Sequence, residues 1–396
     1  MKHNPCVFAV CAFASIISPM AFGDFPSTTP ITLPSTSPNV LPGEELIHKC
    51  EASWTTRAEW EAKVASLRKQ ILGPLAPWPP ATALNPIWRT KISHDGYTVQ
   101  PVAIESMPGF YCIADLYEPT QLAGQHPAII RAHGHFMSGR YGTQEECAAM
   151  ARMGAVVMSV SMVGYNDCKQ YCLEHTKEHE PGPAVFSLQL LNLIRCVDFL
   201  STLPEVDADN INITGESGGG TQTFFLAAVD PRIKVAIPVV MVSATHVGCL
   251  CERGPAGLIP DITNHAEVAA MHAPLPQLVI SDGKDWTKNV PAVEFPYIQK
   301  VYAVMNAADE VENVHLANEG HDYGPSKRNA AYAFFIKYGV LTGTPNETIT
   351  KDSDDALSVF NAKNPLPDTA LKTPVAIENE LAHLQDGTTP SASAKK

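Results

Sequence analysis

The chain has 396 residues, of which 45% are hydrophobic and 17% are charged, a balance that can bury the core of one large or two modest domains. Its formal net charge is -13 and it has no basic run, so the sequence lacks the electrostatic footprint of a nucleic-acid-binding protein. Beyond the N-terminal region, no stretch is long and apolar enough to span a bilayer, so we expect no stable membrane insertion.

The first residues are typical of an export signal. A short positive start precedes a mainly apolar stretch over residues 6–22, and Ala21 and Gly23 are the small residues that favour cleavage after residue 23. The alternative is an N-terminal membrane anchor, but the apolar stretch is short for a spanning helix and Pro19 interrupts it. We therefore expect a signal peptide over 1–23 and a secreted or periplasmic protein.

The cysteine pattern favours disulfides over a metal site. Two of the ten cysteines lie within residues 1–23, so eight remain after cleavage, and an even set in an oxidising compartment permits disulfides. Two close pairs stand out, Cys168 with Cys172 and Cys249 with Cys251. A zinc site at these pairs is the less favoured alternative because their spacings match no zinc template. The sequence cannot decide which cysteines pair.

The N-terminal third predicts a linker, a helix and a hairpin. Residues 24–45 are rich in Pro, Ser and Thr, a composition that cannot build a core, so we expect an extended linker there. Apolar residues recur at helical spacing over 55–72 and predict a helix. Residues 98–106 and 111–119 predict a hairpin.

The rest of the chain alternates between strand and helix signals. Six short apolar runs are typical of strands buried on both faces of a parallel sheet, at residues 127–132, 155–162, 211–214, 235–242, 277–281 and 314–317. Helical patterns lie between most of them, at 187–203, 221–229 and 330–338. This order predicts an α/β fold with about eight strands in a mostly parallel sheet and helices on both faces. We place the domain at 46–345, followed by a partly disordered extension over 346–396.

The pentapeptide at 215–219, Gly-Glu-Ser-Gly-Gly, is the strongest chemical signal, because it has the G-x-S-x-G form of a nucleophile elbow. Such an elbow exposes a serine hydroxyl on a sharp turn, where glycines remove Cβ atoms that would clash. The predicted strand 211–214 and helix 221–229 supply the context that the motif requires. A Gly-rich loop is the alternative, and a phosphate-binding loop fits less well because no lysine follows the glycines. The motif predicts Ser217 as a nucleophile.

A serine hydroxyl needs a base, and in such folds an acid and then a histidine follow the serine along the chain. Two carboxylates follow the predicted strand 277–281. Asp285 is the favoured acid because it lies further into the loop, whereas Asp282 ends the strand and could simply cap the turn. His321 follows the last predicted strand in a glycine-bearing loop, where the base is expected. A surface histidine is the alternative.

Backbone N–H groups must stabilise the oxyanion of the tetrahedral intermediate. Gly218, directly after the serine, is the first candidate donor. The second is the N–H of His135 or Phe136, in the His-Gly-His-Phe loop at 133–136 that follows the third predicted strand. A tight turn with two solvated histidines is the alternative. Three nearby side chains are candidate substrate contacts: Phe136, Glu216 and Trp286.

These motifs resemble the α/β-hydrolase superfamily, and within it the acetyl xylan esterase-like and dienelactone hydrolase-like branch, over residues 52–370. The similar segments are 95–97, 105–110, 133–135, 164–167, 215–223, 285–287 and 320–323. In such relatives the elbow serine, the aspartate before the tryptophan and the late histidine form a triad, which implies Ser217, Asp285 and His321 here. The resemblance implies ester hydrolysis through an acyl-enzyme, often of acetyl groups on plant polysaccharides, with no metal or organic cofactor.

The sequence is compatible with several alternative functions. Glucuronoyl esterases usually have an arginine after the elbow serine, and Gly218 argues against that activity. A serine peptidase of the prolyl oligopeptidase type shares the fold and triad, but no propeller-like extra domain is evident. A catalytically silent hydrolase-like binding module, or a structural cell-surface protein, would leave the triad unexplained. We expect an exported hydrolase of small-molecule or carbohydrate esters, with its oligomeric state open.

Overall fold

The computed structural model describes residues 43–75, 82–121, 124–171, 184–246 and 248–386. The expected signal peptide and nearly all of the expected linker lie outside these ranges. The described residues belong to one compact unit, which includes both the expected domain and the C-terminal extension. None of the helices in the described ranges combines the length and apolarity needed to cross a membrane.

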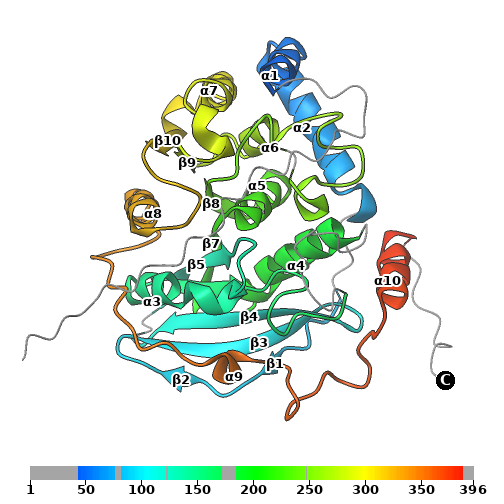
Figure 1. The fold of residues 1–396 in the computed structure, drawn as a ribbon, viewed down its shortest axis with the longest axis vertical. Helices are drawn as coiled ribbons and strands as arrows, with labels where there is room; N and C mark the ends of the chain where they lie inside the picture. Colours follow the sequence, from blue (N-terminus) through cyan, green and yellow to red (C-terminus); the bar gives the residue numbers. More distant parts are fainter. Residues whose placement is uncertain (1–42, 76–81, 122–123, 172–183, 247, 387–396) are drawn as a thin grey trace, which may run out of the picture. The chain divides into compact units, whose positions relative to one another are not determined.

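In the described chain, ten strands form one sheet in the order β1-β3-β4-β6-β5-β7-β8-β9-β10, with β2 paired to β3 (Figure 1). The strands are β1 (Ile87–Trp88), β2 (Ile92–Ser93), β3 (Tyr97–Met107), β4 (Phe110–Pro119), β5 (His126–Ala132), β6 (Val156–Val160), β7 (Val206–Glu216), β8 (Ile233–Val239), β9 (Gln277–Asp282) and β10 (Val311–Leu316). From β6 to β10 all neighbours are parallel, whereas β1 to β4 pair in antiparallel fashion and β4 is antiparallel to β6. The predicted α/β class and mostly parallel sheet are confirmed.

Helices cover both faces of this sheet (Figure 1). They are α1 (Gly43–Ala52), α2 (Arg57–Ile71), α3 (Gln144–Arg152), α4 (Val185–Leu200), α5 (Gly218–Val229), α6 (His265–Ala270), α7 (Glu294–Val304), α8 (Pro325–Lys337), α9 (Asp354–Leu357) and α10 (Pro374–Asp386). Consecutive strand residues point to opposite faces. Accordingly, Ile130 joins a core cluster with α4, α5 and α7, while its neighbour Ile129 joins a second cluster with α3 and α8.

The described part of the C-terminal extension belongs to the packed structure. It includes the helices α9 and α10. Leu357 and Ile377 are fully buried, and the guanidinium of the buried Arg140 donates to the Leu357 carbonyl at 2.7 Å. The described part of the extension therefore contributes buried side chains to the core of the domain.

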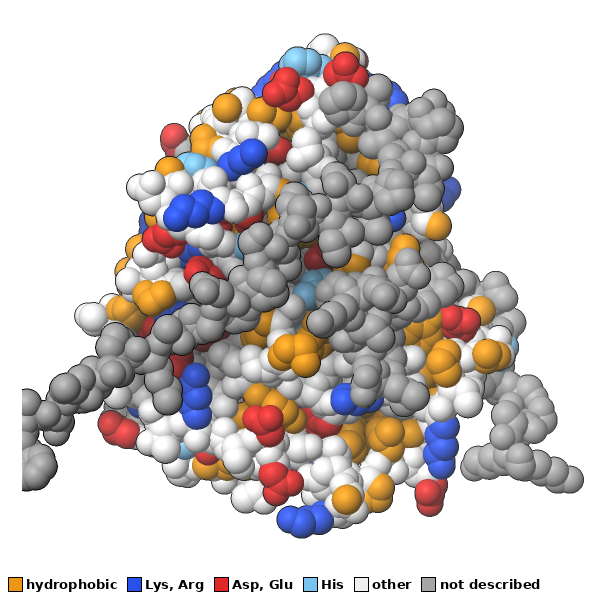
Figure 2. Space-filling model, in the orientation of Figure 1, with side chains coloured by type: hydrophobic (Ala, Val, Ile, Leu, Met, Phe, Trp, Pro, Cys, Tyr) orange, Lys and Arg blue, Asp and Glu red, His pale blue; other side chains and the backbone are white. Residues whose placement is uncertain are grey.

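Charged side chains do not segregate by sign on the face shown in Figure 2, where Lys and Arg are scattered among Asp and Glu. This agrees with the absence of a basic run in the sequence. The described side chains on this face form no basic patch of the kind that binds a phosphate backbone.

Three buried histidines are expected to make the fold sensitive to acid. Burial lowers the pKa of His265 and His272 to about 4 and that of His133 to about 3. In the unfolded chain these pKa values return to about 6.5, so below that pH the unfolded state binds up to three protons that the native state does not. The stability that depends on these neutral rings is therefore complete above about pH 6.5 and is lost as the pH falls toward 4.

As the pH falls from about 6.5 to about 4, we expect protonation of these three histidines in the unfolded chain to lower the free energy of unfolding by up to about 4 kcal/mol per pH unit. Urea titrations at about pH 7 and about pH 5 measure the fall. A His272→Gln variant removes one of the three groups, so its stability should depend less steeply on pH. If the free energy of unfolding depended equally steeply on pH in the variant and the parent, His272 would not be one of the groups responsible.

Candidate functional site

Ser217 lies at the sharp turn between β7 and α5, at the C-terminal edge of the sheet. Its φ of 55° and ψ of -125° place a residue with a side chain in a strained conformation. A Cβ on Gly215 would lie 2.3 Å from the carbonyl oxygen of Ala132, and one on Gly219 would lie 2.1 Å from the same atom. Because these are backbone contacts with β5, the elbow can form only with glycine at both positions.

A Gly219→Ala variant tests this packing. We expect it to destabilise the fold by about 3 kcal/mol, because the new methyl group overlaps the backbone of Ala132 and forces β5 and α5 apart. Gly320→Ala is the matched control in the loop that carries His321, since a Cβ there meets no atom within 4 Å. Urea midpoints of the two variants should differ clearly, and equal midpoints would show that the elbow tolerates a side chain.

The structure brings Asp285 and His321 together. Asp285 follows β9 and His321 follows β10, and Asp285 Oδ2 lies 2.7 Å from His321 Nδ1. The other oxygen, Oδ1, accepts from the backbone N–H of Thr287 at 2.5 Å and from its hydroxyl at 2.6 Å. Burial alone would raise the pKa of Asp285, but the hydrogen bonds from His321 and Thr287 lower it below its usual value. The carboxylate is therefore ionised, and it orients the imidazole through Nδ1.

Asp282, the alternative acid, has different partners. It is fully buried, accepts from the Lys284 N–H at 3.1 Å and lies 3.5 Å from Lys327 Nζ. Burial and the nearby Asp285 carboxylate raise its pKa to about 6. Asp282 thus anchors the turn and Lys327, whereas Asp285 contacts the histidine.

The loop after β5 is fixed from two sides. Nδ1 of the buried His133 lies 2.8 Å from the carbonyl oxygen of Gly134, and Nε2 of the same ring accepts from the Met162 N–H at 3.0 Å. The Gly134 N–H in turn donates to Glu216 Oε1 at 3.1 Å, while Glu216 Oε2 lies 2.6 Å from Arg131. Glu216 was expected among the substrate contacts. It is instead buried behind the elbow, where it ties this loop to the turn that carries the serine.

Two backbone N–H groups, those of Gly218 and of His135 or Phe136, are the expected oxyanion donors beside the elbow. Gly218 is the first residue of α5, where N–H groups have no partner within the helix and the helix dipole favours negative charge. The Phe136 N–H donates to the Gly134 carbonyl at 2.9 Å within its own loop. A Cβ on Gly218 would lie 2.5 Å from His135 Cε1, so the two residues are in direct contact.

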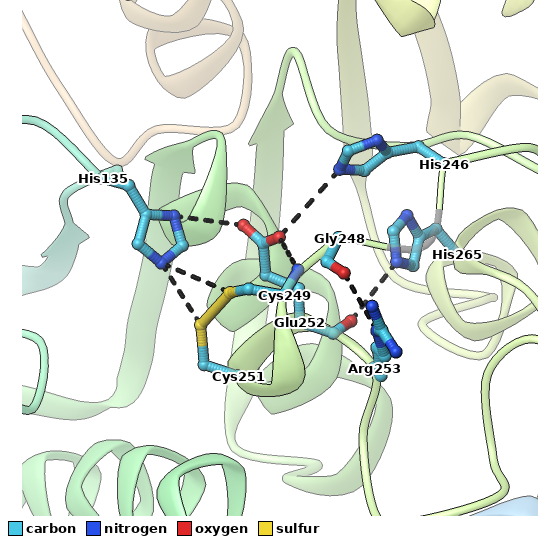
Figure 3. The surroundings of a disulfide bond; sticks show 8 residues. All are labelled: His135, His246, Gly248, Cys249, Cys251, Glu252, Arg253 and His265. Carbon is cyan, nitrogen blue, oxygen red and sulfur yellow. Dashed lines mark hydrogen bonds and ion pairs between the residues drawn. A yellow bond between two sulfur atoms is a disulfide. The ribbon is translucent and has the colours of Figure 1, made fainter. Parts of the chain in front are cut away.

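A continuous row of side chains connects His321 with this loop. The Trp286 ring lies 4.3 Å from the His321 ring and stacks on His246 at 4.1 Å. His246 Nε2 lies 4.0 Å from one oxygen of the buried Glu252, and the other oxygen lies 3.2 Å from His135 Nδ1 (Figure 3). Burial would raise the pKa of Glu252, but His135 and His246 hold it well below its usual value. In this row Trp286 lies directly beside the imidazole of His321.

Sequence reasoning missed two members of this row. Glu252 follows no strand or helix pattern, and His246 precedes the acid along the chain, outside the expected order of serine, acid and histidine. The Ser217 hydroxyl forms no hydrogen bond with His321 among the described residues, and such bonds often tighten only in the substrate complex.

Comparisons with known proteins extend these observations. A family model described as acetyl xylan esterase (AXE1) matches residues 89–243, a span that includes Ser217 and ends before Asp285. A solved structure named Methylesterase BT1017 is 34% identical and has a TM-score of 0.77, with 87% of this chain and 80% of that chain covered. The chain belongs to the acetyl xylan esterase-like branch of the α/β-hydrolases.

Two further comparisons with this esterase are more distant. The protein YtaP of Bacillus subtilis (strain 168), whose name describes a hydrolase, is 25% identical over 248 residues, with 56% of this chain and 81% of that protein covered. A glucuronoyl esterase from Solibacter usitatus has a TM-score of 0.51 at 15% identity, with 71% of this chain and 93% of that chain covered. The latter similarity concerns the fold alone.

Proposed function

We propose that this esterase is a serine carboxylic-ester hydrolase in which Ser217 is the nucleophile, His321 the general base and Asp285 the orienting acid. The observation that carries the proposal is the 2.7 Å contact between Asp285 and His321, at the edge of the sheet where the strained elbow presents Ser217. Oriented through Nδ1, the imidazole has Nε2 available to accept the serine proton.

The proposed reaction is a two-step acyl transfer. His321 removes the proton from Ser217 Oγ, which attacks the ester carbonyl, and the oxyanion is stabilised by the N–H groups of Gly218 and His135. The alcohol leaves with the proton from His321, and water activated by the same imidazole then releases the acid. These steps draw only on protein side chains and backbone, so the mechanism requires no metal or organic cofactor.

Carbohydrate esters are the proposed substrates, and two kinds of ester are candidates. The description of the matching family model favours removal of acetyl groups from a sugar. The name of the 34% identical relative favours removal of methanol from a methyl ester. Trp286 is the proposed substrate contact beside His321, because its indole N–H is buried and has no hydrogen-bond partner among the described residues.

A substrate panel tests the proposal. The purified enzyme is assayed on acetylated xylan, on methyl-esterified uronic acid oligosaccharides and on a prolyl peptide amide. Release of acetate supports the first candidate and release of methanol the second. Cleavage of the amide in preference to both esters would overturn the proposal in favour of a peptidase.

We also propose that the enzyme is exported, on the composition of residues 1–23. Expression of the full chain in a bacterial host should yield a mature protein that begins at Asp24. An uncleaved N-terminus in the exported fraction would contradict this.

A further inference from the structure

The close pair Cys249 and Cys251 meets a histidine from a distant loop. The two cysteines form a disulfide, and His135 Nε2 points at both sulfur atoms (Figure 3). The nitrogen lies 3.2 Å from Cys251 Sγ and 3.7 Å from Cys249 Sγ, although His135 precedes Cys251 by 116 residues. Sequence spacing could not reveal a ligand that lies so far from the cysteines along the chain.

The disulfide contributes little as a cross-link. Only one residue separates the two cysteines, so their bond restrains the unfolded chain far less than a bridge between distant segments would. A role other than stabilising the fold is therefore the better explanation for this cysteine pair.

The two nitrogen–sulfur distances suit a tetrahedral zinc ion. With Zn–S bonds of about 2.3 Å and a Zn–N bond of about 2.0 Å, tetrahedral geometry separates nitrogen and sulfur by about 3.5 Å. The observed distances of 3.2 and 3.7 Å bracket this value. Only the sulfur–sulfur edge must open, from a covalent bond to a distance of about 3.8 Å, which requires that the disulfide is reduced.

The outer contacts of His135 also fit a metal ligand. Its second ring nitrogen, Nδ1, lies 3.2 Å from Glu252 Oε1, the carboxylate–histidine arrangement that directs the other nitrogen toward a metal. Glu252 is itself fixed, because its Oε2 accepts from the Cys249 N–H at 2.9 Å. Cys251 and Glu252 are buried, while His135 and Cys249 are half-buried.

We propose that the reduced form of this protein binds one zinc ion through His135 Nε2, Cys249 Sγ and Cys251 Sγ. A phosphine or dithiol reductant supplies two electrons, the sulfur–sulfur bond breaks, and two thiols form while the reductant is oxidised. Zinc then replaces the two thiol protons, which are released to solvent. The same two sulfur atoms bond either to each other or to the metal, so the redox state selects between the two forms. This site does not depend on the proposed role of Ser217.

Zinc titration of the full chain tests the proposal. Oxidised protein and protein reduced with a phosphine are each titrated with Zn²⁺ against a chromophoric chelator, and Co²⁺ serves as a probe of thiolate ligation through its near-ultraviolet charge-transfer absorption. We expect one tightly bound zinc per reduced chain and none in the oxidised chain. Equal zinc binding by the two forms, or none by the reduced form, would overturn the proposal.

Single-cysteine variants provide the matched comparison. Cys251→Ser removes a ligand, and we expect its zinc affinity to fall by at least about 100-fold, because even the loss of an outer-shell partner costs 10- to 100-fold. Cys147→Ser is the control, since this buried thiol lies in the separate cluster with α3. Equal zinc affinity of the two variants would contradict the assignment. If Cys251→Ser fails to fold, the comparison of zinc binding by the oxidised and reduced parent protein still tests the proposal.

Discussion

Replacement of Ser217 by alanine is expected to lower kcat for ester hydrolysis by about a million-fold, the scale seen when a serine hydrolase loses its nucleophile. Without the hydroxyl no acyl-enzyme can form, and only direct attack by water, aided by the N–H groups of Gly218 and His135, remains. The measurement is kcat on a chromogenic acetate ester, with the urea midpoint as a check on folding.

Ser201→Ala is the matched control for this variant. Ser201 is exposed at the end of α4, and its hydroxyl donates to the Val197 carbonyl one turn back at 2.8 Å. We expect its kcat to stay within about twofold of the parent, because a surface change far from the elbow has little effect. If Ser217→Ala kept a tenth of the parental rate, another residue would have to be the nucleophile.

Asp285→Asn is expected to lower kcat by about ten-thousand-fold with little change in substrate binding. The asparagine side chain can donate to the imidazole and so favours the wrong tautomer, in which the nitrogen facing Ser217 carries the proton. The network around Thr287 remains in place, so the loss should appear in kcat and not in the urea midpoint.

Asp282→Asn provides the comparison that separates the two carboxylates. Asp282 is buried beside Lys327 and has no contact with His321 among the described residues, so we expect kcat to change by less than about tenfold. Its effect should fall on stability instead, because the buried Lys327 loses part of its compensating charge. The opposite pattern, with Asp282→Asn inactive and Asp285→Asn active, would assign the acid to Asp282.

The fold was largely predictable because its strands are buried on both faces. Continuous apolar runs such as 127–132 and 277–281 correspond to β5 and β9, whose central residues are buried on both sides of the sheet. The edge strands β1 and β2 were not predicted, since two residues each carry no periodic signal. Likewise α6 has only six residues, too few for a helical pattern to stand out from the surrounding loop.

Candidate site residues could be predicted only where a residue of suitable chemistry also lies at the expected place along the chain. The elbow at Ser217 has a local motif, and Asp285 and His321 each follow a strand at the same edge of the sheet. By contrast, Glu252 acquires its role through contacts with His135 and His246 that exist only in the folded chain. Glu216 could be named as a neighbour of the serine, but whether its carboxylate faced substrate or Arg131 depended on how β5 and β7 pack.

The most direct test of the proposed mechanism is covalent labelling with a fluorophosphonate probe, followed by intact-mass measurement and peptide mapping. We predict a single adduct on Ser217, formed at least about a hundred times more slowly in a His321→Ala variant, because the serine then lacks its base. An adduct on a different residue, or an active enzyme that takes up no label, would contradict the account.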